Sequence, residues 1–201
     1  RDSDKALCLT DENGHYTSAN KWNKTVDRQF GEGGFKNLYD LKIPSTGANG
    51  ANGDAYVQGY YYIPENYDPS KGIVFTLQGQ GISFWKLEDG TNNAGTGIMF
   101  DSATTSWADQ GAIVVNIHDR STTYTLPDGY DFVLDDVNVM KHFIDTYKVT
   151  GPVVLQGNSR GTMASNIVIK ALAGCEYDPA EQGMGNAKAN PKTLDKSVYN
   201  F

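Results

Sequence analysis

The sequence predicts an α/β fold with a mostly parallel sheet and flanking helices. Three short runs of residues, at 73–77, 112–117 and 153–155, are nearly continuously apolar. Strands that are apolar on both faces belong in parallel sheets covered by helices. A helical pattern separates the second run from the third, and a strand–helix–parallel strand unit is a right-handed crossover. We therefore expect the three runs to lie in one sheet.

The part of the chain before these runs divides into two segments. Residues 1–54 are predicted to be a polar, loop-rich extension, because residues 45–54 consist almost entirely of Gly, Asn, Ala, Ser and Thr. Residues 55–201 are assigned to the sheet-bearing domain. Its first strand is expected at residues 55–63, where β-branched and aromatic residues lead up to Pro64.

Two helices are predicted around the third strand. The first carries apolar residues every three or four positions: Val133, Val137, Met140, Ile144 and Tyr147. The second covers residues 162–173 and stops at Gly174. The tail from 176 to 201 offers at most one weak strand, at residues 197–201.

Composition limits the possible functions. The 201 residues fit one domain, or two small ones, and 39% apolar content is ample for a core. No apolar run approaches the roughly 20 residues that span a bilayer, so no membrane span is predicted. A net charge of −7 argues against a nucleic-acid partner. The abundance of Asn, Gly, Tyr and Thr on an acidic chain indicates an extracellular or cell-surface protein.

Metal and nucleotide sites are not predicted. The two cysteines, Cys8 and Cys175, have no zinc-like spacing; they either form one bridge or remain two separate thiols. Neither a P-loop nor a dinucleotide-binding glycine motif is present. We expect no metal and no cofactor.

The segment Gly157-Asn158-Ser159-Arg160-Gly161 stands between the third strand and the second helix. Gly-x-Ser-x-Gly in that context is a nucleophile elbow, in which a strained serine backbone projects the hydroxyl. Gly157 and Gly161 would supply the space that this conformation needs. The helix that follows would direct its N-terminal N–H groups toward a developing oxyanion. The alternative is an ordinary turn in which Ser159 caps the helix.

A second glycine-rich loop follows the run at 73–77. In Gln78-Gly79-Gln80-Gly81, Gly79 and Gly81 would let backbone N–H groups approach a substrate carbonyl, as in an oxyanion loop. The alternative is a plain glycine turn.

From about Tyr56 to Gly174 the chain resembles the α/β-hydrolase superfamily, most closely its secreted esterase and prolyl-oligopeptidase-like branch. The resemblance implies an eight-stranded, mostly parallel sheet and a Ser–His–Asp/Glu triad. It assigns Ser159 as the nucleophile and the N–H groups of Arg160 and Gln80 as oxyanion donors. Gln78 departs from the family, where many relatives carry His, and so does Arg160, where small or aromatic residues are commoner. The resemblance rests on Tyr61-Tyr62-Ile63-Pro64, Tyr67-Asp68-Pro69, Gln78-Gly79-Gln80-Gly81, Asp119-Arg120, the helix around Asp136, and Gly157-Asn158-Ser159-Arg160-Gly161.

The family's triad histidine follows the serine, and here no histidine follows Ser159. Of the three that precede it, His142 is expected to be structural, and His118 is a stronger candidate for the base than His15. In the family's strand order, the strand at 153–155 lies inside the sheet, with three more strands beyond it. Left as the last strand, it would expose an apolar edge with unpaired backbone groups, which is an aggregation hazard. We therefore expect a cleaved or truncated chain, whose second polypeptide supplies the histidine, the acid and the C-terminal half of the domain.

The expected function is serine hydrolysis of a carboxylic ester, or second a peptide, through an acyl-enzyme. The alternative is a non-catalytic α/β-hydrolase-like binding or adhesion module. Substrate specificity in this fold lies in loops such as 82–107, whose aromatic residues either line a pocket or pack. These are Phe84, Trp85 and Trp107.

Overall fold

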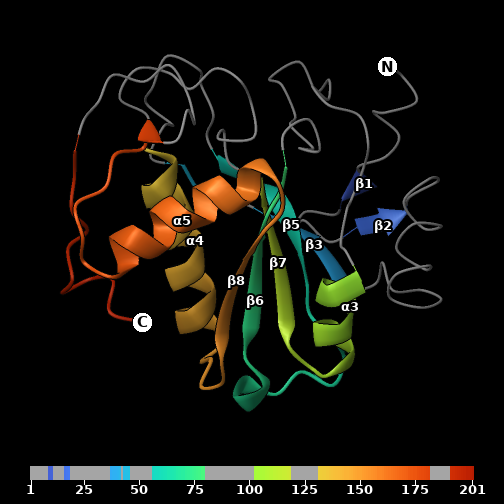
Figure 1. The fold of residues 1–201 in the computed structure, drawn as a ribbon. Coiled ribbons are helices and arrows are strands. Elements are labelled where there is room, and N and C mark those ends of the chain that lie inside the picture. Colours follow the sequence, from blue (N-terminus) through green and yellow to red (C-terminus); the bar gives the residue numbers. More distant parts are fainter. Residues whose placement is uncertain are drawn as a thin grey trace, which may run out of the picture.

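The centre of the molecule is a mixed six-stranded sheet, which confirms the predicted α/β class (Figure 1). The computed structural model describes residues 9–10, 16–18, 37–41, 43–45, 56–79, 102–118, 131–181 and 191–201. The strand order is β3-β5-β7-β6-β8, and β4 also pairs with β5. Strands β6, β7 and β8 are parallel to one another, whereas β5 runs antiparallel to β7.

Among the described residues, the elements are short strands, three α-helices and one short 3₁₀-helix. The strands of the large sheet are β3 (Leu38–Asp40), β4 (Ile43–Pro44), β5 (Tyr56–Tyr62), β6 (Ile73–Leu77), β7 (Ile113–His118) and β8 (Val153–Gly157). A separate two-stranded sheet contains β1 (Leu9–Thr10) and β2 (Tyr16–Ser18). The helices are η3 (Pro69–Lys71), α3 (Ser102–Asp109), α4 (Phe132–Thr146) and α5 (Arg160–Leu172).

The predicted strands and both predicted helices are present. The main difference is the length of β8, which continues two residues beyond the apolar run at 153–155. Its parallel pairing with β6 extends through Gln156 and Gly157, opposite Thr76 and Leu77. Helix α5 starts at Arg160, directly after the elbow serine, rather than at residue 162.

The expected extension at 1–54 contributes strands to the large sheet. Leu38–Asp40 pairs with the end of β5, and Ile43–Pro44 pairs with its beginning, so the boundary predicted at residue 54 falls between strands of one sheet. Ser45 is 8% exposed and its hydroxyl donates to the Asp135 carboxylate of α4 at 2.6 Å. Pairing with β5 holds these short strands in place, and this contact is not visible in local composition.

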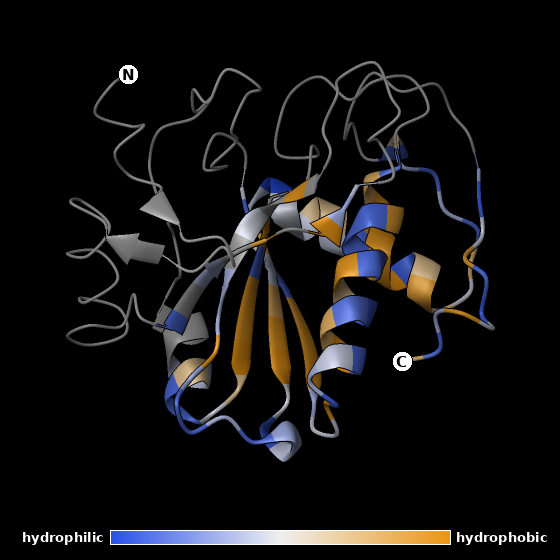
Figure 2. Cartoon of the chain, turned by 180° about the vertical axis from the view of Figure 1, so that it is seen from behind, coloured by the Kyte–Doolittle hydropathy of each residue, from blue (hydrophilic) through white to orange (hydrophobic). Residues whose placement is uncertain are grey.

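The main core lies between the sheet and helices α4 and α5 (Figures 1 and 2). Phe75 of β6 meets Phe143 of α4 edge to face, with ring centroids 6.4 Å apart. Because side chains alternate along a strand, Val74 and Thr76 face the other side of the sheet. Strand β6 is buried along its whole length, as expected for the middle of a covered parallel sheet.

Helix α4 ends in a left-handed residue that is not glycine. The C-cap is Tyr147, and the next residue, Lys148, has φ 53°. The Val149 N–H donates to the Ile144 carbonyl at 3.1 Å, the bond that closes a Schellman motif. Glycine is the usual residue at this position because a Cβ is unfavourable in the left-handed region.

We expect Lys148→Gly to raise the free energy of unfolding by about 0.5–1 kcal/mol, because it relieves this backbone strain. The matched control, Lys141→Gly in the interior of the same helix, should lower it by about 1 kcal/mol. Chemical denaturation of both variants measures the difference. A loss of stability in both variants would contradict the strain argument.

A row of polar side chains crosses the sheet on the face that Thr76 shares. Thr76 lies in register with Asn116 of β7 and with Gln156 of β8. Asn116 is fully buried and Thr76 is 3% exposed. Among the described residues the Thr76 hydroxyl finds no hydrogen-bond partner. A buried hydroxyl without a partner costs free energy on folding.

Replacing Thr76 by Val, which has nearly the same shape, is therefore expected to raise the free energy of unfolding by about 1 kcal/mol. The control is Thr146→Val at an exposed position in the last turn of α4, where the effect should be within about 0.5 kcal/mol. Thermal unfolding of both variants tests this. A destabilised Thr76→Val protein would indicate that the hydroxyl is satisfied by ordered water.

The C-terminal tail does not form the weak strand considered at residues 197–201. Instead, residues 196–198 form a turn, with the N–H groups of Val198 and Tyr199 both donating to the Asp195 carbonyl at 3.0 Å. The described tail is attached to the domain by buried Tyr177 and Leu194. Within the described residues, no helix has both the length and the hydropathy needed to cross a membrane.

Candidate active site

Ser159 occupies the turn between β8 and α5 with an unusual backbone conformation. Its φ is 53° and its ψ is −117°. In the described part of the chain, Lys148 is the one other non-glycine residue with positive φ. A conformation of this kind costs about 1–3 kcal/mol and persists only where the surrounding structure enforces it. The strained serine backbone that the elbow prediction requires is therefore present.

The two flanking glycines are required by close backbone packing. A Cβ at Gly157 would lie 2.5 Å from both the Gly161 carbonyl oxygen and the Thr162 Cα. A Cβ at Gly161 would overlap the Leu77 carbonyl oxygen and lie 2.8 Å from that of Gln78. Real Cβ atoms do not approach backbone so closely, so the first turn of α5 can sit against β6 and β8 only with glycine at both positions.

Hydrogen bonds hold the turn to the neighbouring strand. The Asn158 N–H donates to the Leu77 carbonyl at 3.0 Å, which links the elbow to the end of β6. The Gly161 N–H donates to the Asn158 carbonyl at 2.8 Å, and the Thr162 N–H donates to the Ser159 carbonyl at 2.9 Å. These contacts over-determine the turn and offset the strain at Ser159. They also fix the elbow relative to the start of the glycine loop after β6.

The Ser159 side chain is exposed, and it makes no capping hydrogen bond to helix α5 although the residue stands at the cap position. The helix-cap alternative therefore lacks the contact that would define it. The nearby Ser165 differs, because it is 5% exposed and its hydroxyl donates to the Gly161 carbonyl at 2.8 Å. Of these two hydroxyls, only that of Ser159 is accessible from solvent.

Of the two expected oxyanion donors, Arg160 is described by the structure and Gln80 is not. Arg160 is the first residue of α5, so its N–H belongs to the N-terminal turn, where the helix dipole favours negative charge. Gln80 and Gly81 lie outside the described residues. The start of the same loop is described: Gln78 and Gly79 are both buried at the end of β6.

No base is placed against Ser159 by the described residues. His142 is an exposed residue of α4 whose ring meets that of Phe143 edge to face, with ring centroids 5.5 Å apart. His118 ends β7, where its backbone pairs with Gln58, but its side chain lies outside the described residues. His15 also lies outside them.

Other predicted site features fall partly beyond what the structure describes. Phe84, Trp85, Asp119 and Arg120 lie outside the described residues. Trp107 lies in helix α3, half-buried, rather than in a loop. Among the described residues, no three His, Cys, Asp or Glu side chains are grouped as metal ligands. Cys175 is exposed and not disulfide-bonded.

The N-cap of α4, Asp131, was not identified from the sequence. Asp131 caps this helix, with its carboxylate accepting from the Leu134 N–H at 3.2 Å. The signal was available, because an aspartate directly before an apolar periodic segment is a typical helix N-cap. Its additional contacts with the tail depend on residues more than forty positions away.

Comparison with known proteins adds a distant likeness. A scan against protein-family models finds no match, and a search of curated proteins finds none. Among solved structures, a lipase in its open form superposes with a TM-score of 0.41 at 16% sequence identity. The superposition covers 65% of this chain and 39% of the lipase chain.

Proposed function

We propose that this chain carries the nucleophile of a serine hydrolase that acts on carboxylic esters, with peptides as the second substrate class. The Ser159 hydroxyl oxygen attacks the ester carbonyl carbon while a histidine removes its proton. The alcohol leaves with a proton returned by that histidine, and water then hydrolyses the acyl-serine to the free acid. The N–H groups of Arg160 and Gln80 stabilise the oxyanion in both steps.

The observation that carries this proposal is the backbone of Ser159. A serine with φ 53° and ψ −117°, between a buried parallel sheet and a helix N-terminus, is held in a costly conformation by glycines that permit no Cβ. A capping serine has no need of this strain, since cap residues ordinarily have extended backbones. An elbow that exposes a nucleophile does need it.

The direct experiment is labelling with a fluorophosphonate probe, followed by peptide mapping in a mass spectrometer. An activated serine displaces fluoride and retains the phosphonyl group on its oxygen. In the complete protein, we expect the adduct on the peptide that contains Ser159. Labelling of a different serine, or none in a folded protein, would favour the non-catalytic binding module.

We further propose that a second polypeptide completes the sheet at β8 and supplies the histidine and the acid. Among the described residues, β8 pairs with β6 alone. Val153 is 40% exposed, and the rest of the strand is half-buried, although residues 153–155 are all apolar. An open apolar edge of this kind attracts another strand.

Intact mass of the purified protein under denaturing conditions tests the second polypeptide. We expect a second chain to accompany this one and to remain bound in native mass spectra. A soluble monomer of this chain with full hydrolase turnover would overturn the proposal and make His118 the leading candidate for the base.

A further inference from the structure

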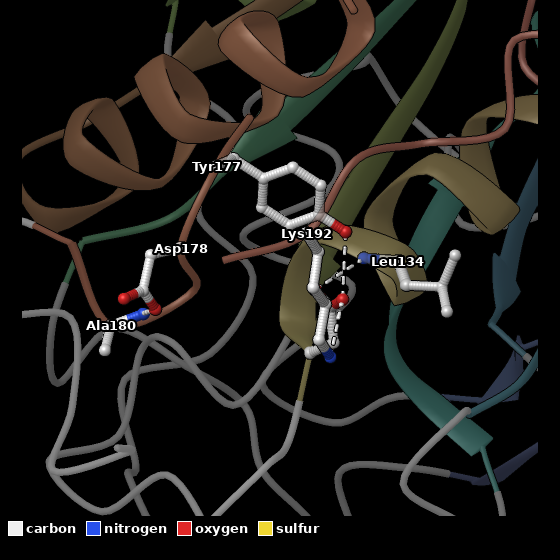
Figure 3. A network of polar contacts seen from close by, with 6 residues as sticks. Leu134, Tyr177, Asp178, Ala180 and Lys192 are labelled. Atoms are coloured by element: carbon white, nitrogen blue, oxygen red, sulfur yellow. Dashed lines mark hydrogen bonds and ion pairs between the residues drawn. The ribbon is translucent and has the colours of Figure 1, made fainter. Parts of the chain in front are cut away.

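The carboxylate of Asp131 joins three separate segments of the chain, and Figure 3 shows its partners Leu134, Tyr177 and Lys192. One oxygen accepts from the Leu134 N–H of its own helix at 3.2 Å. The other accepts from the Tyr177 hydroxyl at 2.9 Å and from the Lys192 ammonium at 3.2 Å. Asp131 is 5% exposed and Tyr177 is 2% exposed, so these contacts are shielded from solvent.

Tyr177 and Lys192 belong to two arms of the tail, residues 175–181 and 191–199, which we call the strap. The two arms pair with each other through one antiparallel β-bridge between Tyr177 and Lys192. The Tyr177 N–H donates to the Lys192 carbonyl at 2.9 Å, and the Lys192 N–H donates to the Tyr177 carbonyl at 2.8 Å. Leu194, on the second arm, is 6% exposed and joins the main core.

Both arms are also attached to the helices. On the first arm, the Cys175 N–H donates to the Lys170 carbonyl at 3.1 Å, and Glu181 pairs with the Lys170 ammonium at 2.5 Å. On the second arm, the Tyr199 hydroxyl donates to the Asn138 side chain of α4 at 2.5 Å, and the Lys196 ammonium donates to the Leu172 carbonyl of α5. The strap therefore crosses from α5 to α4, and both arms meet at Asp131.

The chemistry of this junction makes the two arms depend on each other. Burial, together with the charge of Asp131, raises the pKa of Tyr177 well above its ordinary value, so its hydroxyl remains a donor throughout the usable pH range. Lys192 supplies the opposite charge to the carboxylate. If either arm moves away, the Asp131 carboxylate stays buried but loses one of its hydrogen-bond donors, which costs free energy. Release of one arm therefore weakens the attachment of the other.

We propose that the strap opens locally as one cooperative unit while the sheet remains folded. Asp131 is the residue that couples its two arms. The two arms share one bridge, whereas β6 and β7 pair along five residues each. Segments attached mainly by separate side-chain contacts, without continuous backbone pairing to the sheet, open locally at a lower free energy than core strands. Opening lifts Tyr177 and Leu194 from the core and uncovers the apolar surface beneath them. This inference does not depend on the proposed hydrolase activity.

Native-state hydrogen exchange on the full chain, followed residue by residue by NMR, tests whether the strap opens as one unit. We expect the amides of Tyr177 and Lys192 to exchange through one common opening, faster than the amides of β6 and β7. Exchange of the strap amides only through global unfolding would overturn the proposal. So would clearly different openings for the two arms.

Two variants test whether Asp131 couples the two arms. Tyr177→Phe and Lys192→Met each remove one donor to Asp131, and each is expected to accelerate exchange of both bridge amides by about 10-fold to 100-fold. Amides of β6 and β7 should keep their wild-type rates. The control Lys71→Met removes an exposed lysine beside Asp68 in η3, away from the strap contacts, and should leave strap exchange unchanged. Acceleration confined to the mutated arm would show that Asp131 does not couple the arms.

Discussion

Replacing Ser159 by Ala is expected to abolish fluorophosphonate labelling and to lower ester turnover by about 10⁶-fold, the scale observed when a serine protease loses its nucleophile. The change removes the oxygen that would form the acyl-enzyme and leaves the backbone of the turn in place. Side-chain effects on folding should be small, because Ser159 is exposed and makes no capping bond. Turnover and labelling are measured on the complete protein, with unfolding followed in parallel.

The matched control is Ser165→Ala, six residues along the same helix. Its hydroxyl is buried and donates to the Gly161 carbonyl, so the variant should lose about 1 kcal/mol of stability and keep its labelling. Labelling that survives Ser159→Ala, or disappears in a folded Ser165→Ala protein, would show that the elbow assignment is wrong.

Local chemistry explains why much of the candidate site is readable from sequence. Gly157 and Gly161 are needed within five residues of each other, and the strand and helix that they connect are continuous with them. The strain at Ser159 follows from that same short segment. Likewise, β6 is buried along its length, so its apolar run alone predicts a covered parallel strand.

Features that depend on distant partners are not readable in this way. Leu38–Asp40 is a strand because it pairs with β5, and its own composition gives no such indication. The strap depends on Tyr177 and Lys192 reaching Asp131 across 46 and 61 residues. The sequence of the tail predicted no more than one weak strand, because a single buried tyrosine or leucine forms no periodic pattern.

Gly161→Val is expected to cause the largest structural loss in the site. The valine Cβ would overlap the Leu77 carbonyl oxygen and crowd that of Gln78, and neither backbone atom can move without separating α5 from β6. We expect the free energy of unfolding to fall by about 1–3 kcal/mol or more. Turnover should fall as well, since the same displacement moves Ser159 relative to the loop after β6.

Arg160→Ala, at the adjacent position, is the control for this steric effect. It shows whether any substitution in the turn lowers stability and kcat, or only one that introduces a clash. Alanine keeps the backbone N–H that is proposed to bind the oxyanion, whereas loss of such a donor typically costs about 10²–10³ in kcat. We therefore expect stability and kcat close to wild type for Arg160→Ala, with Gly161→Ala intermediate between it and Gly161→Val. A large rise in KM at unchanged kcat would instead assign the guanidinium to binding an acidic group on the substrate. Equal tolerance of Arg160→Ala and Gly161→Val would mean that the first turn of α5 does not pack against β6 as an elbow requires.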